Sequence, residues 1–211
     1  MNAPMIQGTE EWLAARLGKV TASRMDDVMA RTKTGYGASR ANYMAQLIVE
    51  QLTGKVAESY TNAAMAWGTE NEPAARAAYE FVTELEVVET GFVLHPTIPD
   101  SGASPDGLVG MDGLVEIKCP SSATHIETLL TKTIPGKYQK QMLWQMVCTG
   151  RIWCDYVSFD PRMPEHLRLF VQRMHYDTDE VKRMESEVLV FLTEMHAKLD
   201  KLKKLKLGLD K

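Results

Sequence analysis

The segment 104–120, SPDGLVGMDGLVEIKCP, combines residue types that suit metal-dependent chemistry. Asp106 lies in a Pro-Asp-Gly turn, and Glu116, Ile117 and Lys118 follow in an apolar stretch. Alternate residues of a strand share one face, so Glu116 and Lys118 should project together while Ile117 faces the core. A hairpin turn at 111–113 would bring Asp106 opposite Glu116. Two carboxylates and an ammonium group would then occupy one small volume.

These three groups match the requirements of phosphodiester hydrolysis. Carboxylates suit a hard cation such as Mg²⁺, which takes one or two protein carboxylates and keeps several waters. One or two such ions polarise a phosphoryl oxygen, activate water and stabilise the leaving oxygen. Lys118 would add positive charge beside the attacking water and the developing phosphorane. The segment therefore indicates a candidate metal–carboxylate site.

A simpler interpretation of the same segment stays open at this point. Glu116 and Lys118 would form a solvated ion pair on an edge strand, and Pro-Asp-Gly would be an ordinary turn. The pattern is short and common, which favours this interpretation when the pattern is taken alone. The preceding Leu114 and Val115 instead indicate a buried central strand, where an unused charge is costly.

Hydrophobic periodicity predicts the elements that must position these residues. Helices are expected at 9–17, with Thr9 as N-cap, and at 21–30, 39–52, 62–85, 137–149 and from Asp177 or Thr178 onward. The helix over 62–85 should be in two pieces, because Gly68 and Pro73 fall inside it. Strands are expected at 87–95, 102–108, 114–119, 153–159 and 167–176, and the basic segment 31–40 should be an exposed loop. This order predicts an α/β or α+β layer fold.

Composition bounds the class of protein. The 211 residues suit one domain over 1–211, with 45% hydrophobic and 25% charged residues as in a globular protein. We expect no membrane span and no secretory signal. Three cysteines without CxxC spacing argue against a disulfide framework or zinc cluster, so a reducing cytoplasm is the expected compartment.

The formal net charge of −4 counts against nucleic-acid binding, which needs a local basic surface to neutralise phosphates. Net charge does not decide the matter, because an acidic protein can carry a basic groove or channel.

Five blocks in this order resemble the lambda-type exonucleases, or YqaJ-like viral recombinases, a branch of the PD-(D/E)xK nuclease superfamily. The blocks are EEWLAARLGKVTAS (10–23), AMAWGTENEPAARAAYEF (64–81), SPDGLVGMDGLVEIKCP (104–120), YQKQMLWQM (138–146) and FDPRM (159–163). The resemblance implies a restriction-endonuclease-like core, with a central mixed sheet flanked by helices.

The resemblance also implies roles for individual residues. Asp106 and Glu116 would bind one or two Mg²⁺ ions, for which Mn²⁺ can substitute, and the backbone carbonyl of Ile117 would help. Lys118 would orient the nucleophilic water. Glu72 in WGTENE would be a further acidic residue of the metal site, and Gln141 in YQKQM the glutamine on the helix after the catalytic strand.

A pocket for the 5′-phosphate of DNA is implied at Arg16 in WLAAR and Ser23 in TAS, assisted by Ser104. Arginine suits bidentate phosphate recognition, and a hydroxyl near a helix start suits an anion, although Arg16 alone could equally be an exposed helix charge. Met65 in AMAW falls where the family places an apolar wedge that splits the terminal base pair, but a methionine on an alanine-rich helix is more often core.

The resemblance as a whole implies a Mg²⁺-dependent exonuclease that degrades double-stranded DNA in the 5′→3′ direction from 5′-phosphorylated ends. The remaining 3′ single strand would serve phage-type recombination by strand annealing. A ring-shaped homotrimer, a single-strand annealing partner and a phage- or prophage-encoded protein in a bacterial cell are implied as well. Two alternatives remain: an endonuclease or repair nuclease on the same scaffold, and a non-catalytic protein that binds DNA ends.

Overall fold

A mixed five-stranded sheet forms the centre of the protein. The computed structural model describes residues 5–56 and 63–205. In the order β10-β9-β8-β7-β4, the strands are Leu169–His175, Trp153–Phe159, Gly113–Lys118, Gly107–Val109 and Val87–Val88. Strands β8 and β9 are parallel, and the other neighbours are antiparallel. The expected central mixed sheet is therefore confirmed.

Two smaller sheets accompany the central one. The first has the order β1-β6-β5, with strands Val20–Thr21, Ser101–Ala103 and Val93–Leu94. The second is an exposed hairpin of β2, Arg31–Thr32, and β3, Gly35–Tyr36. The segment expected as a loop at 31–40 thus contains this hairpin and the start of the next helix.

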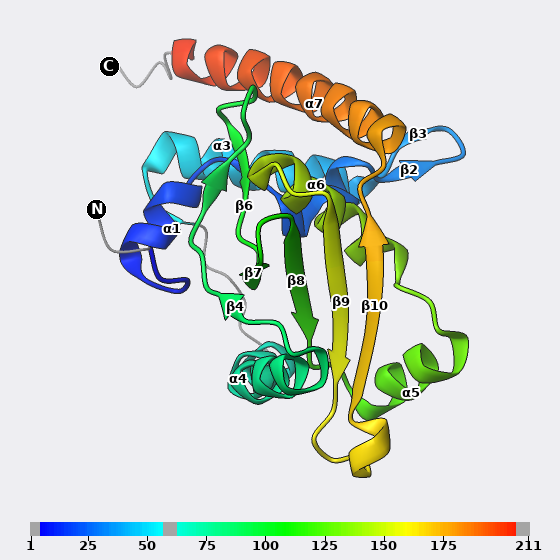
Figure 1. Cartoon of the computed structure of the whole chain (residues 1–211). Coiled ribbons are helices and arrows are strands. Elements are labelled where there is room, and N and C mark those ends of the chain that lie inside the picture. The colour runs from blue at the N-terminus through cyan, green and yellow to red at the C-terminus, as the bar shows by residue number, and fades with distance from the viewer. Residues whose placement is uncertain (1–4, 57–62, 206–211) are drawn as a thin grey trace.

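Helices flank the sheet and cover its ends. They are α1 Glu10–Arg16, α2 Met25–Val28, α3 Ala38–Thr53, α4 Ala63–Thr83, α5 Ser122–Thr131, α6 Gly136–Thr149 and α7 Thr178–Lys204. Short 3-10 turns occupy Ala22–Arg24 and Glu165–Leu167. In Figure 1, β8, β9 and β10 lie side by side, with α4 and α5 near one end of them and α3 and α7 near the other.

Two apolar clusters lie on opposite faces of the sheet. On one face, Ala75 and Tyr79 of α4 pack with Val115 and Ile117 of β8. On the other face, Leu114 belongs to the larger cluster, which α2, α3, α6 and α7 build. Strand β8 is therefore buried on both faces, as the apolar run before Glu116 indicates.

The helix ends follow the expected capping chemistry in most places. The Thr9 hydroxyl accepts a hydrogen bond from the Trp12 amide, and the Asp177 carboxylate accepts two at the start of α7. Gly54, with a φ of 66°, ends α3. Thr21 forms no side-chain cap, and the helix expected at 21–30 is instead a 3-10 turn followed by α2.

The predicted break in the helix over 62–85 is wrong. Helix α4 is continuous, with Pro73 inside it. A proline in a helix interior costs about 3 kcal/mol through the lost hydrogen bond and a clash. Pro73 lies on the exposed side, where solvent can reach the backbone, while Ala75 and Tyr79 pack against the sheet. The predicted first residue, Asn62, lies outside the described residues.

Two predicted strands are each divided between sheets. The segment 87–95 contains β4, which pairs with β7, and β5, which pairs with β6. The segment 102–108 is likewise split into β6 and β7 by the Pro-Asp turn. Helix α5 was not predicted. Within the described residues, no helix is long and apolar enough to span a membrane.

Candidate active site

The β7–β8 hairpin brings Asp106 to Glu116. Gly107 pairs with Val115 and Val109 with Gly113, so the next step of this register places Asp106 opposite Glu116. The Asp106 Oδ2 atom accepts a hydrogen bond of 2.7 Å from the Ile117 amide. This is the juxtaposition expected from the sequence, with the turn at 110–112 and Gly113 already in the strand.

Glu116 is fully buried and held by side chains from two elements. Its Oε1 atom accepts a hydrogen bond of 2.6 Å from Gln141 Nε2 and pairs with the Lys118 ammonium. Its Oε2 atom accepts one of 2.6 Å from Gln145 Nε2. Both glutamines lie on α6, one helical turn apart. Asp106, Glu116, Lys118 and Gln141, which we call the carboxylate–lysine cluster, are therefore brought together.

The electrostatics of the cluster indicate an excess of negative charge. Burial, followed by the neighbouring Glu116 carboxylate, raises the pKa of Asp106 to about 8. Burial lowers the pKa of Lys118, but Glu116 and Asp106 outweigh it and hold that pKa above its usual value. Lys118 therefore stays protonated, whereas Asp106 keeps its proton at neutral pH until a bound cation offsets its charge.

The donor set fits Mg²⁺ better than a softer metal. Within the described residues, no group of three or more His, Cys, Asp and Glu side chains is arranged to hold a metal. Two carboxylates with a backbone carbonyl and water ligands are what Mg²⁺ commonly uses. A dication would also balance the charge that raises the pKa of Asp106. Asp106 and Glu116, with the carbonyl of Ile117, are thus the candidate ligands.

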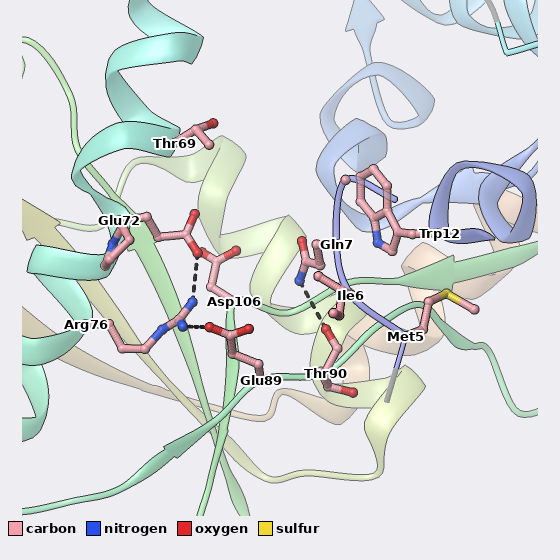
Figure 2. Close-up of a pocket in the computed structure, with 12 residues that line it drawn as sticks. Met5, Ile6, Gln7, Trp12, Thr69, Glu72, Arg76, Glu89, Thr90 and Asp106 are labelled. Atoms are coloured by element: carbon pink, nitrogen blue, oxygen red, sulfur yellow. Dashed lines mark hydrogen bonds and ion pairs between the residues drawn. The ribbon is translucent and has the colours of Figure 1, made fainter. Parts of the chain in front are cut away.

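Glu72 lies beside Asp106 across a cavity. This first cavity, of about 400 Å³, is lined by both residues together with Trp12, Thr69, Arg76 and Glu89. Figure 2 shows the Glu72 carboxylate turned toward Asp106, while Arg76 donates to Glu72 at 3.0 Å and pairs with Glu89. The Glu72 carboxylate is therefore paired with Arg76, and it lines both cavities that contain Asp106.

Arg16 and Ser104 are brought together next to the first cavity. Ser104 Oγ accepts hydrogen bonds from Trp12 Nε1 at 2.9 Å and from Arg16 Nη1 at 3.5 Å. The Arg16 guanidinium also covers the Trp12 ring at 3.9 Å. Because Trp12 and Asp106 line the same cavity, the Arg16–Ser104 group is connected to the carboxylate–lysine cluster through that cavity.

Ser23 and Met65 lie on separate elements, the 3-10 turn Ala22–Arg24 and helix α4, and Met65 lines a cavity together with Asp106 and Lys118. Ser23 is exposed, and its hydroxyl lies 3.4 Å from that of Thr21. Among the described residues it makes no hydrogen bond to Arg16 or Ser104. Met65 lies in the first turns of α4 with 52% of its surface exposed, so it is not a core residue of the described structure.

Two residues of this site were missed by the sequence analysis. Gln145 is fully buried and binds Glu116, and its position four residues after Gln141 on a helix is the signal that could have revealed it. Gln7 Nε2 donates 2.8 Å and 3.3 Å hydrogen bonds to the carbonyls of Pro105 and Thr90. Gln7 precedes the first helix, and no local pattern points to it.

Comparisons with known proteins agree on one family. Residues 11–152 match the model of the YqaJ-like viral recombinase domain. Two structures of an alkaline exonuclease from Laribacter hongkongensis, one in complex with dAMP, share 54% identity and a TM-score of 0.87 with this chain. The match covers 93% of this chain and 97% of theirs.

A phage-related exonuclease from Haemophilus somnus 129PT shares the fold. Its identity is 15% and its TM-score 0.72, over 87% of this chain and 96% of that one. No curated protein sequence matches this chain.

Proposed function

The chain belongs to the YqaJ-like viral recombinase family, and we propose that it is a Mg²⁺-dependent exonuclease that degrades double-stranded DNA in the 5′→3′ direction. The observation that carries the proposal is the carboxylate–lysine cluster on β8 and the Pro-Asp turn. Its residue types suit phosphodiester hydrolysis, and the 54% identical relative is an alkaline exonuclease.

Each residue of the cluster has a proposed task. When bound at Asp106 and Glu116, Mg²⁺ would supply Lewis-acid stabilisation of the phosphoryl oxygens. Lys118 stays protonated and would place a positive charge and a hydrogen-bond donor beside the attacking water. Gln141 holds the Glu116 carboxylate in one orientation. Burial of Glu116 keeps bulk water from competing for these contacts.

The group formed by Arg16 and Ser104 is the proposed binding site for the DNA end. Arg16 and Ser104, with Ser23, would bind the terminal 5′-phosphate, because arginine and hydroxyl donors suit phosphate oxygens. That a mononucleotide, dAMP, binds the similar Laribacter enzyme agrees with a product of this size. Met65, which is exposed on α4 and lines a cavity that also contains Asp106, is proposed as the wedge at the terminal base pair. Glu72 is proposed as a further acidic residue of the metal site.

Digestion of a linear duplex labelled at either end tests the proposal. With Mg²⁺, a 5′-phosphorylated duplex should be shortened from its 5′ ends much faster than its 5′-hydroxyl twin, leaving 3′ single strands. A covalently closed circle should survive. Rapid cutting of the circle would favour an endonuclease, and binding of ends without hydrolysis would favour a non-catalytic end-binding protein.

The biological setting is proposed from family membership alone. The 3′ strand would pass to a single-strand annealing protein in phage-type recombination, and the exonuclease would be a homotrimer. A pull-down with a purified single-strand annealing protein from the same phage or prophage should recover the pair, and failure of the two proteins to associate would refute the partnership.

A further inference from the structure

A second cavity adjoins the carboxylate–lysine cluster. It has a volume of about 810 Å³ and shares Thr69, Glu72 and Asp106 with the first cavity. From there it continues past Lys118 to Arg162. The two cavities thus meet at the carboxylate–lysine cluster, so a chain-like ligand that crosses the site would have one part in each.

Arg162 is held rigidly at this second cavity. Its Nε and Nη2 atoms donate to the two oxygens of the fully buried Asp160 at 2.7 Å and 3.0 Å, and Nη2 lies 3.4 Å from the carbonyl oxygen of Pro120. Burial raises the pKa of Asp160, but hydrogen bonds from Arg162 and Ser122 outweigh burial and bring this pKa down to about 2. The Asp160–Arg162 pair therefore stays ionised.

The same guanidinium keeps donors available for a ligand. Within 5–56 and 63–205, the Nη1 atom of Arg162 has no hydrogen-bond partner. Nearly half of the Arg162 side chain is exposed, at 48%. A fixed arginine with a free nitrogen suits a phosphate oxygen, because little conformational entropy remains to be lost on binding.

The Trp67 ring packs against the other side of Arg162. The guanidinium lies 4.4 Å from the centre of the Trp67 ring. The indole Nε1 is buried, and no described residue accepts its hydrogen bond. Across the cavity, the Lys137 ammonium lies 4.7 Å from the ring centre of Tyr138. Cations set among aromatic rings are typical of surfaces that bind single-stranded nucleic acid.

The arrangement of the two cavities gives the strand a direction. Arg16, Ser104 and Trp12, the proposed 5′-phosphate group, adjoin the first cavity. Arg162 lines the second cavity, beyond Asp106 and Lys118. We propose that Arg162, held by Asp160 and Trp67, binds a backbone phosphate on the 3′ side of the scissile bond. This proposal rests on the proposed 5′→3′ exonuclease function.

The test removes the charge of one phosphate at a time. A set of 5′-phosphorylated duplexes is prepared, each with one neutral methylphosphonate at a different position along the strand. The affinity of the protein for each duplex is measured with Ca²⁺ in place of Mg²⁺. The affinity of the wild-type protein should fall about tenfold when one of the first phosphates on the 3′ side of the scissile bond is neutralised. In Arg162→Gln that position should cost nothing, while the 5′-phosphate preference should persist.

Arg183→Gln is the matched control. Arg183 lies on α7, pairs with Glu180 and is 63% exposed, so its removal should leave the position-specific loss as in the wild type. The proposal is overturned if no neutral phosphate on the 3′ side weakens binding by the wild type, a result that needs no variant to fold. It is equally overturned if folded Arg162→Gln keeps the same loss.

Failure of this proposal is distinguishable from failure of the proposed function. The same wild-type preparation is assayed for shortening of a labelled duplex from the 5′ end with Mg²⁺. If it does so and the methylphosphonate pattern is unchanged in Arg162→Gln, only the role of Arg162 is wrong. If it shortens the duplex from the 3′ end or not at all, the proposed function is wrong.

Discussion

At the scale of single residues, Glu116 shows how the site tolerates a buried charge. An isolated carboxylate in a protein interior is strongly unfavourable, yet Glu116 has no exposed surface. Lys118 and Gln141 supply hydrogen bonds to one oxygen and Gln145 to the other. The carboxylate is therefore fixed in orientation before any ion binds, which reduces the cost of assembling a metal site.

We expect Gln145→Met to weaken Mg²⁺ binding rather than to prevent folding. The substitution keeps the side chain's size but removes the 2.6 Å hydrogen bond to Glu116. The Mg²⁺ concentration for half-maximal DNA degradation should rise about tenfold. A Mg²⁺ titration of initial rates measures this, with Gln139→Met as a control, because the exposed Gln139 bonds Ile134 and not Glu116. Superimposable titrations of Gln145→Met and wild type would contradict the positioning role.

At the scale of elements, local sequence patterns predicted the helices and strands whose formation depends on neighbouring residues. Strand 153–159 was predicted with the bounds of β9, and α7 was predicted to start at Asp177 or Thr178, of which Asp177 is the cap. A long amphipathic pattern is typical of a surface helix and is hard to mistake for another element. The hairpin that joins Asp106 to Glu116 followed from alternation and turn residues. Local pattern therefore predicted that Asp106, Glu116 and Lys118 lie together, whereas Gln141 came only from the family resemblance.

The parts that sequence reasoning missed depend on partners distant along the chain. A single apolar run at 87–95 gives no sign that β4 pairs with β7 while β5 pairs with β6. Helix α4 continues through Pro73 because Ala75 and Tyr79 are packed against β8 and its neighbours. Gln7 donates to the carbonyl of Pro105, which is distant along the chain, and the sequence around Gln7 contains no pattern that predicts this contact. Tertiary packing overrides local propensity at each of these points.

The close approach of β8 and β9 at Gly113 gives a prediction at this scale. A Cβ atom on Gly113 would lie 2.0 Å from a ring carbon of Trp153, and the Arg173 guanidinium covers the same ring at 3.5 Å. Gly113→Ala should therefore lower the free energy of unfolding by about 1–3 kcal/mol, since the ring must be displaced. Urea denaturation measures the change.

Gly136→Ala serves as the control for this prediction. A Cβ atom on Gly136 would meet no atom within 4 Å, and the residue begins α6. The free energy of unfolding of Gly136→Ala should match or slightly exceed that of the wild type. Equal denaturation midpoints for Gly113→Ala and Gly136→Ala would show that the β8–β9 contact is looser than the structure indicates.

At the scale of the whole molecule, an acidic protein must still attract DNA. The net charge is −4, and the second cavity is lined by the cations Lys118, Lys137 and Arg162 together with the acidic Glu72 and Asp106, so a dication bound at Asp106 would make this cavity basic. Cations concentrated at a groove provide the local field that phosphate binding needs. A closed ring of copies would extend this arrangement, because only the inner surface would have to be basic.

The proposed homotrimer is a prediction about the assembled protein. A closed ring satisfies each copy's interfaces without leaving a growing end. Light scattering on the purified protein should give a molar mass three times that of the chain, and this mass should be independent of protein concentration in the micromolar range. A mass equal to one chain would rule out the ring under these conditions.

The central claim is that Asp106, Glu116 and Lys118 carry out hydrolysis, and the most direct test removes two of them separately. Asp106→Ala deletes a carboxylate whose pKa burial raises to about 8, and Lys118→Ala deletes the ammonium beside Glu116. Mg²⁺-dependent, single-turnover degradation of an end-labelled duplex should fall by about a hundredfold or more in each variant. Folding and binding of the duplex should be nearly unchanged, and Lys182→Ala, on the exposed side of α7, should behave like the wild type. Wild-type rates in both Asp106→Ala and Lys118→Ala would contradict the account.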